Sequence, residues 1–130
     1  MRTRSKRGTG FVEAVVAAIV LIPIALCLMD LIVLVIANSM HDTACKNAAR
    51  AAANQPDQSS ANSAADKSLE SFRKSGIVKA IQINTVEYGD EAVAVETQML
   101  VKLPVPFPGI NDLSFKAVDI EPIVVMKKDD

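Results

Sequence analysis

The residues best suited to chemistry in this 130-residue chain are its single histidine and its two cysteines. His41 and Cys45 lie four positions apart, so in a helix they share one face, with Asp42 beside them. Such a pair can begin a metal site, but no strong third and fourth ligand accompanies it. A catalytic triad needs a nucleophile motif as well, and none occurs. We therefore expect no metal, no cofactor, no small-molecule substrate and no enzymatic activity.

Length and composition narrow the class of protein further. The chain can form one small domain with an appendage rather than two full domains. Aromatic residues make up only 4% of it and Trp is absent, which argues against a large aromatic-lined ligand pocket. The formal net charge of -1 gives no general basis for nucleic-acid binding.

Hydropathy is strongly segregated along the chain. A short basic stretch, residues 1–8, precedes an apolar run from Phe11 to Ala37 that only Glu13 and Asp30 interrupt. As a helix this run spans roughly 40 Å, whereas about 20 apolar residues already cross a bilayer. We predict a single-pass helix in the lipid bilayer. The basic leader places the N-terminus in the cytoplasm and the rest of the chain, in a bacterium, in the periplasm.

The helix is expected to continue beyond the membrane, over residues 9–53. Small residues and Met recur at every fourth position after the apolar run (Met40, Ala44, Ala48 and Ala52), which predicts a stripe that packs on a globular head. Pro23 is expected to kink the helix or to open a hydrogen bond about one turn earlier. Cys27 is expected to face lipid or an interface, and Cys45 is a candidate for cross-linking to a second subunit.

The segment Lys6–Glu13, KRGTGFVE, stands directly at the start of the apolar run. It resembles the processing site of type IV prepilins and pseudopilins, in which a basic leader ends in Gly and an acid occupies the fifth position after the cut. With Pro23, Asp30 and the run NAARAAA (47–53), the chain looks like the TadE-like minor pilins of tight-adherence, or Flp, pili. The likeness covers residues 6–53 well and the head loosely, in part through LPVPFPGINDLSF (103–115).

The resemblance implies cleavage by a prepilin peptidase between Gly8 and Thr9, and a registering contact by Glu13. Residue chemistry agrees with these roles. Gly is the least hindered residue to precede a scissile bond in an extended backbone. A carboxylate in mid-bilayer costs about 2.5 kcal/mol or more and so implies a partner, which the new amino group of a neighbouring Thr9 would supply. The alternative is that Glu13 reaches the membrane surface.

Asp30 is the second acid of the apolar run, about 25 Å beyond Glu13 along a helix. It is a candidate for an intramembrane contact with another pilin or with the pilus assembly platform. Alternatively it is an interfacial acid on a tilted helix.

The remainder, residues 54–130, predicts a small α+β head. A polar turn at 54–60 leads to a short helix capped by Ser59 or Ser60 and stopped by Gly76. Two strands, 77–88 and 92–103, are joined by Gly89-Asp90-Glu91. The second alternates, with one face expected to be buried: Val93, Val95, Thr97, Met99, Val101 and Leu103. A loop at residues 104–109 and a strand at about 113–126, bent near Pro122, complete an antiparallel sheet of about three strands.

These features favour a minor pilin that takes part in assembling a Flp-type pilus for surface attachment. Two other classes remain open. An uncleaved single-pass anchor would carry a periplasmic head that binds a partner in a secretion complex, and it would be indifferent to substitution of Gly8. A secreted protein released by ordinary signal peptidase would lack residues up to about 39, but the apolar region of a signal peptide is only about 7–15 residues long.

Overall fold

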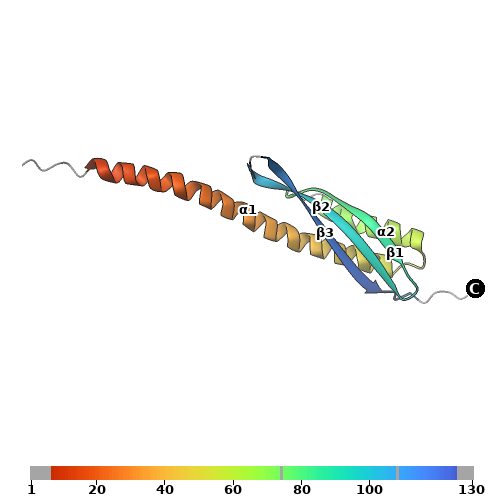
Figure 1. Cartoon of the computed structure of the whole chain (residues 1–130). Helices are drawn as coiled ribbons and strands as arrows, with labels where there is room; N and C mark the ends of the chain where they lie inside the picture. The colour runs from red at the N-terminus through yellow and green to blue at the C-terminus, as the bar shows by residue number, and fades with distance from the viewer. Residues whose placement is uncertain (1–6, 74, 108, 126–130) are drawn as a thin grey trace, which may run out of the picture.

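The computed structural model describes residues 7–73, 75–107 and 109–125. In chain order the elements are α1 (Arg7–Ala53), α2 (Gln58–Arg73), β1 (Val78–Tyr88), β2 (Ala92–Phe107) and β3 (Ile110–Pro122). Figure 1 shows α1 as a long stem whose C-terminal half is packed against α2 and the sheet, which together form the head. The α+β layout predicted from the sequence is confirmed. Most of the basic leader, residues 1–6, lies outside the described residues.

The three strands form one antiparallel sheet in the order β1-β2-β3, so β2 is central. The predicted turn at Gly89-Asp90-Glu91 joins β1 to β2, and the backbone N–H of Gly89 donates to the carbonyl of Ala92 at 2.9 Å. A Cβ at Gly89 would lie only 2.9 Å from that same oxygen, so the turn requires glycine there. Gly109 in the β2–β3 turn has a φ of 88°, a backbone conformation that favours glycine for a different reason, because a side chain there would be strained.

One face of the sheet builds the core of the head. The alternation predicted for β2 is confirmed, because all six of its expected inward residues are buried. α1 covers β2 and β3 while α2 covers β1 and contacts α1. The small residues that α1 buries here are Ala37, Ala44, Cys45, Ala48, Ala49, Ala52 and Ala53. Because these side chains are short, the α1 backbone lies close to the sheet, and Leu69 of α2 supplies the bulk beside it.

The second helix begins earlier than the sequence suggested and has a different cap. The predicted caps, Ser59 and Ser60, lie inside α2, and Asp57 immediately precedes it. The Asp57 carboxylate accepts hydrogen bonds from the Ser60 backbone N–H at 2.8 Å and from the Ser60 hydroxyl at 3.0 Å. These hydrogen bonds, together with that from the Ser59 backbone, lower the pKa of Asp57. Ser60 therefore helps the cap as a donor rather than forming it.

The predicted loop at residues 104–109 is wrong for residues 104–107, because β2 continues through Pro104 and Pro106 to Phe107. Proline is tolerated there since few ladder hydrogen bonds are lost. Pairing with β1 ends at Val101, and the ladder with β3 is irregular between Lys102 and Phe107. Pro108, the last proline of the predicted loop, lies outside the described residues. The third strand also begins and ends about three or four residues earlier than expected, stopping at Pro122.

Candidate membrane and assembly surface

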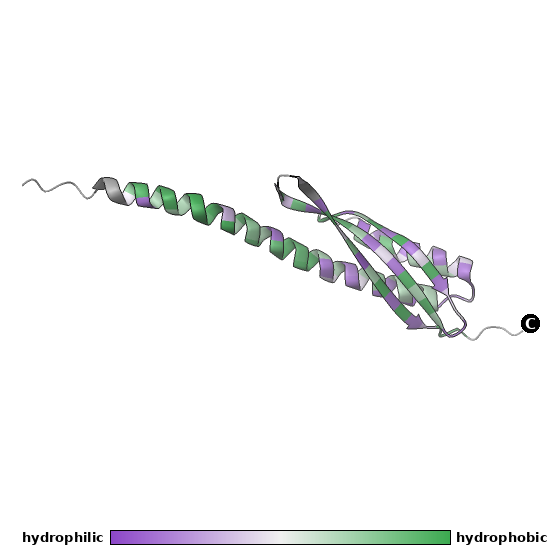
Figure 2. Ribbon diagram, viewed as in Figure 1, coloured by the Kyte–Doolittle hydropathy of each residue, from purple (hydrophilic) through white to green (hydrophobic). Residues whose placement is uncertain are grey.

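The N-terminal half of α1 is an exposed apolar rod. Every residue from Gly10 to Met29 is exposed, and the large apolar side chains among them include Phe11, Ile19 and Leu21, at 74%, 66% and 62% exposure. Figure 2 shows the hydrophobic colour along this half of the helix, whereas the head is mixed. Within the described residues this helix is the one long and apolar enough to cross a membrane. The sequence-predicted span and the exposed rod thus coincide.

The residues of the proposed processing site lie at the start of the same helix. α1 begins at Arg7, so the backbone at Gly8 and Thr9 belongs to its first turn. Glu13 follows a little more than one turn later and is exposed on the rod, with no hydrogen bond or ion pair to any described residue. A peptidase that needs an extended backbone at Gly8 must therefore unwind the first turn, which Gly8 itself weakens.

The helix runs through Pro23 without a break. Because proline has no N–H, the carbonyl of Ile19 lacks its usual donor four residues later. Figure 1 shows α1 curving gently along its length.

Asp30 marks the level at which the head meets the exposed rod. Its side chain is only 3% exposed, and its Oδ1 atom accepts a hydrogen bond of 3.1 Å from the backbone N–H of Val105 in β2. Its Oδ2 atom is buried and has no hydrogen-bond partner among the described residues. The structure thus gives this acid a partner within its own chain, which neither sequence interpretation considered. A contact of Asp30 with another subunit or the assembly platform stays a prediction.

His41 and Cys45 face the centre of the sheet rather than solvent. The His41 Nε2 atom lies 2.9 Å from the hydroxyl oxygen of Thr97, and the Cys45 thiol donates to the carbonyl of Val95 at 3.5 Å. Both residues lie beyond the apolar rod, inside the head. Burial lowers the pKa of His41, although Asp42 and Thr97 oppose this, and burial raises the pKa of Cys45. Each side chain has a hydrogen-bond partner within the core.

The two cysteines differ in their exposure to solvent. Cys45 is 1% exposed, so the suggestion that it cross-links a second subunit is wrong for the folded head. Cys27 is exposed on the rod, and both cysteines are free. Among the described residues no group of three or more His, Cys, Asp or Glu side chains could hold a metal ion.

The end of the β2–β3 hairpin carries a feature that the sequence analysis missed. An open cleft of about 700 Å³ is lined there by Lys79, Lys102, Leu103, Pro104, Pro106 and Asp112. Lys79 and Asp112 form an ion pair across it, while Lys102 is exposed beside its apolar wall. The signal available in the sequence is a proline-rich apolar run bounded by Lys102 and Asp112, which predicts a loop and carries part of the family resemblance but indicates no cleft.

The head is fastened to the far end of α1 by polar contacts as well. Arg50 forms an ion pair of 3.1 Å with Glu121, and the Tyr88 hydroxyl donates to the carbonyl of Gln55 at 2.5 Å. The Gln58 side chain links α2 to β1 through the Val86 carbonyl at 2.7 Å and the Tyr88 N–H at 3.0 Å. Polar contacts therefore hold the head to the stem from Asp30 to Arg50, and Gln55 and Gln58 continue them in the turn and in α2.

Comparison of the chain with protein-family models, with curated proteins and with solved structures finds no match.

Proposed function

We propose that this chain is a TadE-like minor pilin: a subunit made in the bacterial inner membrane, cut by a prepilin peptidase and used in assembling a Flp-type pilus for surface attachment. The observation that carries the proposal is the division of one continuous helix into two halves. Its first half is apolar and exposed on all sides, and its second half is buried against a small α+β head. A stem of this kind can pass from lipid into a bundle of similar stems, since both surround it with apolar surface.

The sequence at the start of the stem supports the same proposal. The basic residues of the leader favour a cytoplasmic N-terminus. Cleavage after Gly8 would leave Thr9 with a free amino group four residues before Glu13. In a filament, the Glu13 carboxylate of one subunit would pair with the Thr9 amino group of the next and set the axial register in a medium of low dielectric constant.

The head would contribute contacts rather than catalysis. Its outer surface includes Val118 and Ile120 of β3, which are 62% and 65% exposed on the sheet face opposite the helices. Other pilin subunits and the assembly platform are the proposed partners, and a head-to-tail contact between subunits generates an open filament.

The test is intact-mass and N-terminal analysis of the full chain extracted from its native membrane. We expect an N-terminus at Thr9, and we expect Gly8→Val to abolish it. Gly10→Val is the matched control, because a Cβ at Gly10 meets nothing within 4 Å and the residue lies beyond the proposed cut. The control should still be processed.

Three results would contradict the proposal. A chain that retains its leader, in a cell whose prepilin peptidase is active, would support the uncleaved anchor with a partner-binding head. An N-terminus near residue 40 would identify the apolar rod as a signal peptide. Equal loss of cleavage in both glycine variants would show that Gly8 does not define the site.

A further inference from the structure

The apolar surface of α1 and the end of the head overlap along the helix axis. On the side away from the sheet, exposed apolar residues continue past Asp30: Leu31, Ile32, Val35 and Ile36 are 57%, 60%, 70% and 44% exposed. From Phe11 to Ile36 the helix is roughly 39 Å long, whereas the hydrocarbon core of a bilayer is about 30 Å thick. Burying this surface in lipid therefore brings the membrane boundary to the level of Asp30, or beyond it.

The end of the β2–β3 hairpin reaches this same level. Val105 donates its N–H to Asp30, so this part of β2 lies against α1 where the exposed rod meets the head. Figure 1 shows the hairpin directed back toward the N-terminal half of α1, away from the rest of the head. A membrane around the exposed rod would meet the hairpin end before any other part of the sheet.

The chemistry of the hairpin end suits the surface of a bilayer. No charged residue occurs between Lys102 and Asp112. Pro104 and Pro106 are exposed there, and neither has a backbone N–H that needs a partner. Val105 does have one, and Asp30 accepts it. Residues 104–106 thus present apolar side chains and no unpaired backbone donor, a requirement for contact with the apolar side of the interface.

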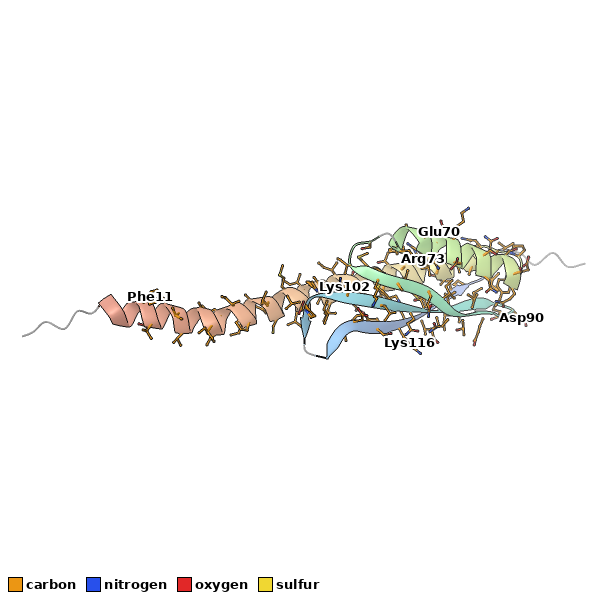
Figure 3. All side chains as sticks on the ribbon, turned by 90° about the horizontal axis from the view of Figure 1, so that it is seen from above. Phe11, Glu70, Arg73, Asp90, Lys102 and Lys116 are labelled. Atoms are coloured by element: carbon orange, nitrogen blue, oxygen red, sulfur yellow. The ribbon has the colours of Figure 1, made fainter. Side chains whose placement is uncertain are left out.

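Positive charge lies just behind this apolar end. Lys79 and Lys102 line the open cleft of about 700 Å³ with Leu103, Pro104 and Pro106. Asp112 pairs with Lys79, whereas Lys102 makes no ion pair within the described part of the chain. Figure 3 places Lys102 at the end of the sheet where the stem leaves the head, and Lys116 farther along the sheet. A lysine beside an apolar surface can bind the phosphate of a lipid headgroup while its stem lies on the acyl-chain side.

We propose that the end of the β2–β3 hairpin rests on the membrane surface and that its cleft, through Lys102, binds the headgroup of an anionic phospholipid. The inference rests on the part of the proposed function that inserts α1 in a membrane, but not on cleavage or pilus assembly. Bound in this way, the head has a fixed tilt and height on the bilayer. The shielded Asp30 carboxylate is covered by the hairpin rather than by lipid.

The absence of Trp from the chain allows a direct test, since one introduced indole is the sole one present. Full-length Pro106→Trp is reconstituted in phosphatidylcholine vesicles containing phosphatidylglycerol, with lipids brominated near the headgroup end of their acyl chains. We expect strong quenching of its fluorescence. Ile120→Trp, on an exposed position of the same sheet roughly 27 Å farther along β3 than Asp112, should stay unquenched. Leu21→Trp, in the middle of the rod, should be quenched by lipids brominated deep in the chains.

The three variants separate the possible outcomes. Quenching of Leu21→Trp without quenching of Pro106→Trp would overturn the inference and leave the membrane anchor intact. No quenching of Leu21→Trp would overturn the membrane anchor itself. Equal quenching of Ile120→Trp and Pro106→Trp would show a head lying flat on the bilayer, which contradicts the proposed orientation. In a further outcome, the fluorescence of Pro106→Trp changes with the protein-to-lipid ratio and is unaffected by brominated lipid. That result would show that a second copy of the chain occupies the cleft, and it would contradict the proposal.

The headgroup contact has its own test. Quenching of Pro106→Trp should rise with the fraction of phosphatidylglycerol. The additional substitution Lys102→Gln should lower the binding constant for the anionic lipid roughly fivefold, which is the contribution of one lysine near an anionic surface. Lys116→Gln is the matched control, because Lys116 is an exposed lysine on the same sheet that does not line the cleft. An equal effect of the two substitutions would overturn the headgroup site. Inorganic phosphate in solution should not compete, and competition would indicate a site for free phosphate instead.

Discussion

The backbone N–H of Val105 donates a hydrogen bond of 3.1 Å to the Oδ1 atom of Asp30, across a separation of 75 residues. It joins the central strand of the head to the stem helix at the level where the exposed rod meets the head. Val105 stands between two prolines, so its N–H is the one backbone donor of residues 104–106. Asp30 therefore accepts the one backbone hydrogen bond that the Pro-Val-Pro segment can donate.

Removal of the Asp30 acceptor should loosen this junction. Asp30→Leu leaves the half-buried Val105 N–H without its partner, and we expect the free energy of local opening at Val105 to fall by about 1 kcal/mol. Amide hydrogen exchange of Val105 in detergent micelles measures it. Asp30→Asn retains an oxygen acceptor and should keep most of the protection. Unchanged exchange in Asp30→Leu would contradict a structural part for this hydrogen bond.

His41 should make the stability of the head depend on pH. Burial lowers its pKa below the ordinary 6.5, so the folded chain holds it neutral while the unfolded chain already binds a proton. The free energy of unfolding should therefore be level above about pH 6.5 and decrease as the pH falls from there through the lower, folded pKa. Urea unfolding at several pH values measures this slope. Because His41 is the one histidine, His41→Gln should remove the slope above about pH 5, where most carboxyl groups remain ionised; a persisting slope would exclude His41 as its source.

The cap of α2 offers a prediction that separates Asp57 from the serines after it. Asp57→Ala removes the acceptor of the Ser60 N–H and should lower the free energy of unfolding by about 1 kcal/mol. Asp57→Asn keeps an oxygen there and should restore most of the loss. Ser60→Ala, which keeps the backbone hydrogen bond, should cost less than Asp57→Ala. Thermal unfolding followed by circular dichroism compares the stability of the three variants. A larger loss of stability in Ser60→Ala than in Asp57→Ala would show that Ser60, rather than Asp57, is the capping residue.

The contact between α1 and the head should not tolerate larger side chains. Ala48 is fully buried among other alanines, so Ala48→Leu forces the helix and sheet apart and should destabilise the head by about 1–3 kcal/mol. Ala18→Leu makes the same change on the exposed rod and should leave the unfolding of the head unaltered. Denaturant unfolding monitored at Tyr88, the one tyrosine and a residue that packs on the core, measures both variants.

Much of the fold follows from periodicity in the sequence. The two-residue alternation from Val93 to Leu103 and the four-residue recurrence from Ala44 to Ala52 each predicted a buried face, and the structure buries both. These patterns are local, since a strand or a helix determines which of its own residues share a face. The long helix, the hairpin turn at Gly89 and the order of elements were predictable for the same reason.

Partners across elements were not predictable in this way. Whether His41 meets Thr97, or Asp30 meets Val105, depends on how β2 is placed along α1, and no local pattern determines that placement. The sequence interpretation of Pro104 and Pro106 failed for a related reason. Proline argues against a central strand, yet β2 has lost its β1 neighbour at that point, which is visible only in the sheet register.

Because α1 is one unbroken helix, the number of residues in its exposed rod determines how the head is oriented about the helix axis. Glu13 marks one side of the otherwise apolar exposed rod, while the head covers one side of the upper half and leaves Asp42, Lys46 and Arg50 on another. Because each helical residue adds a rotation of about 100°, a single insertion between Cys27 and Asp30 would swing the head around the rod by that angle and raise it about 1.5 Å. The number of residues in the stem thus sets the rotation of the head about the helix axis relative to the rod. It therefore also sets the side on which a neighbouring molecule can contact the head.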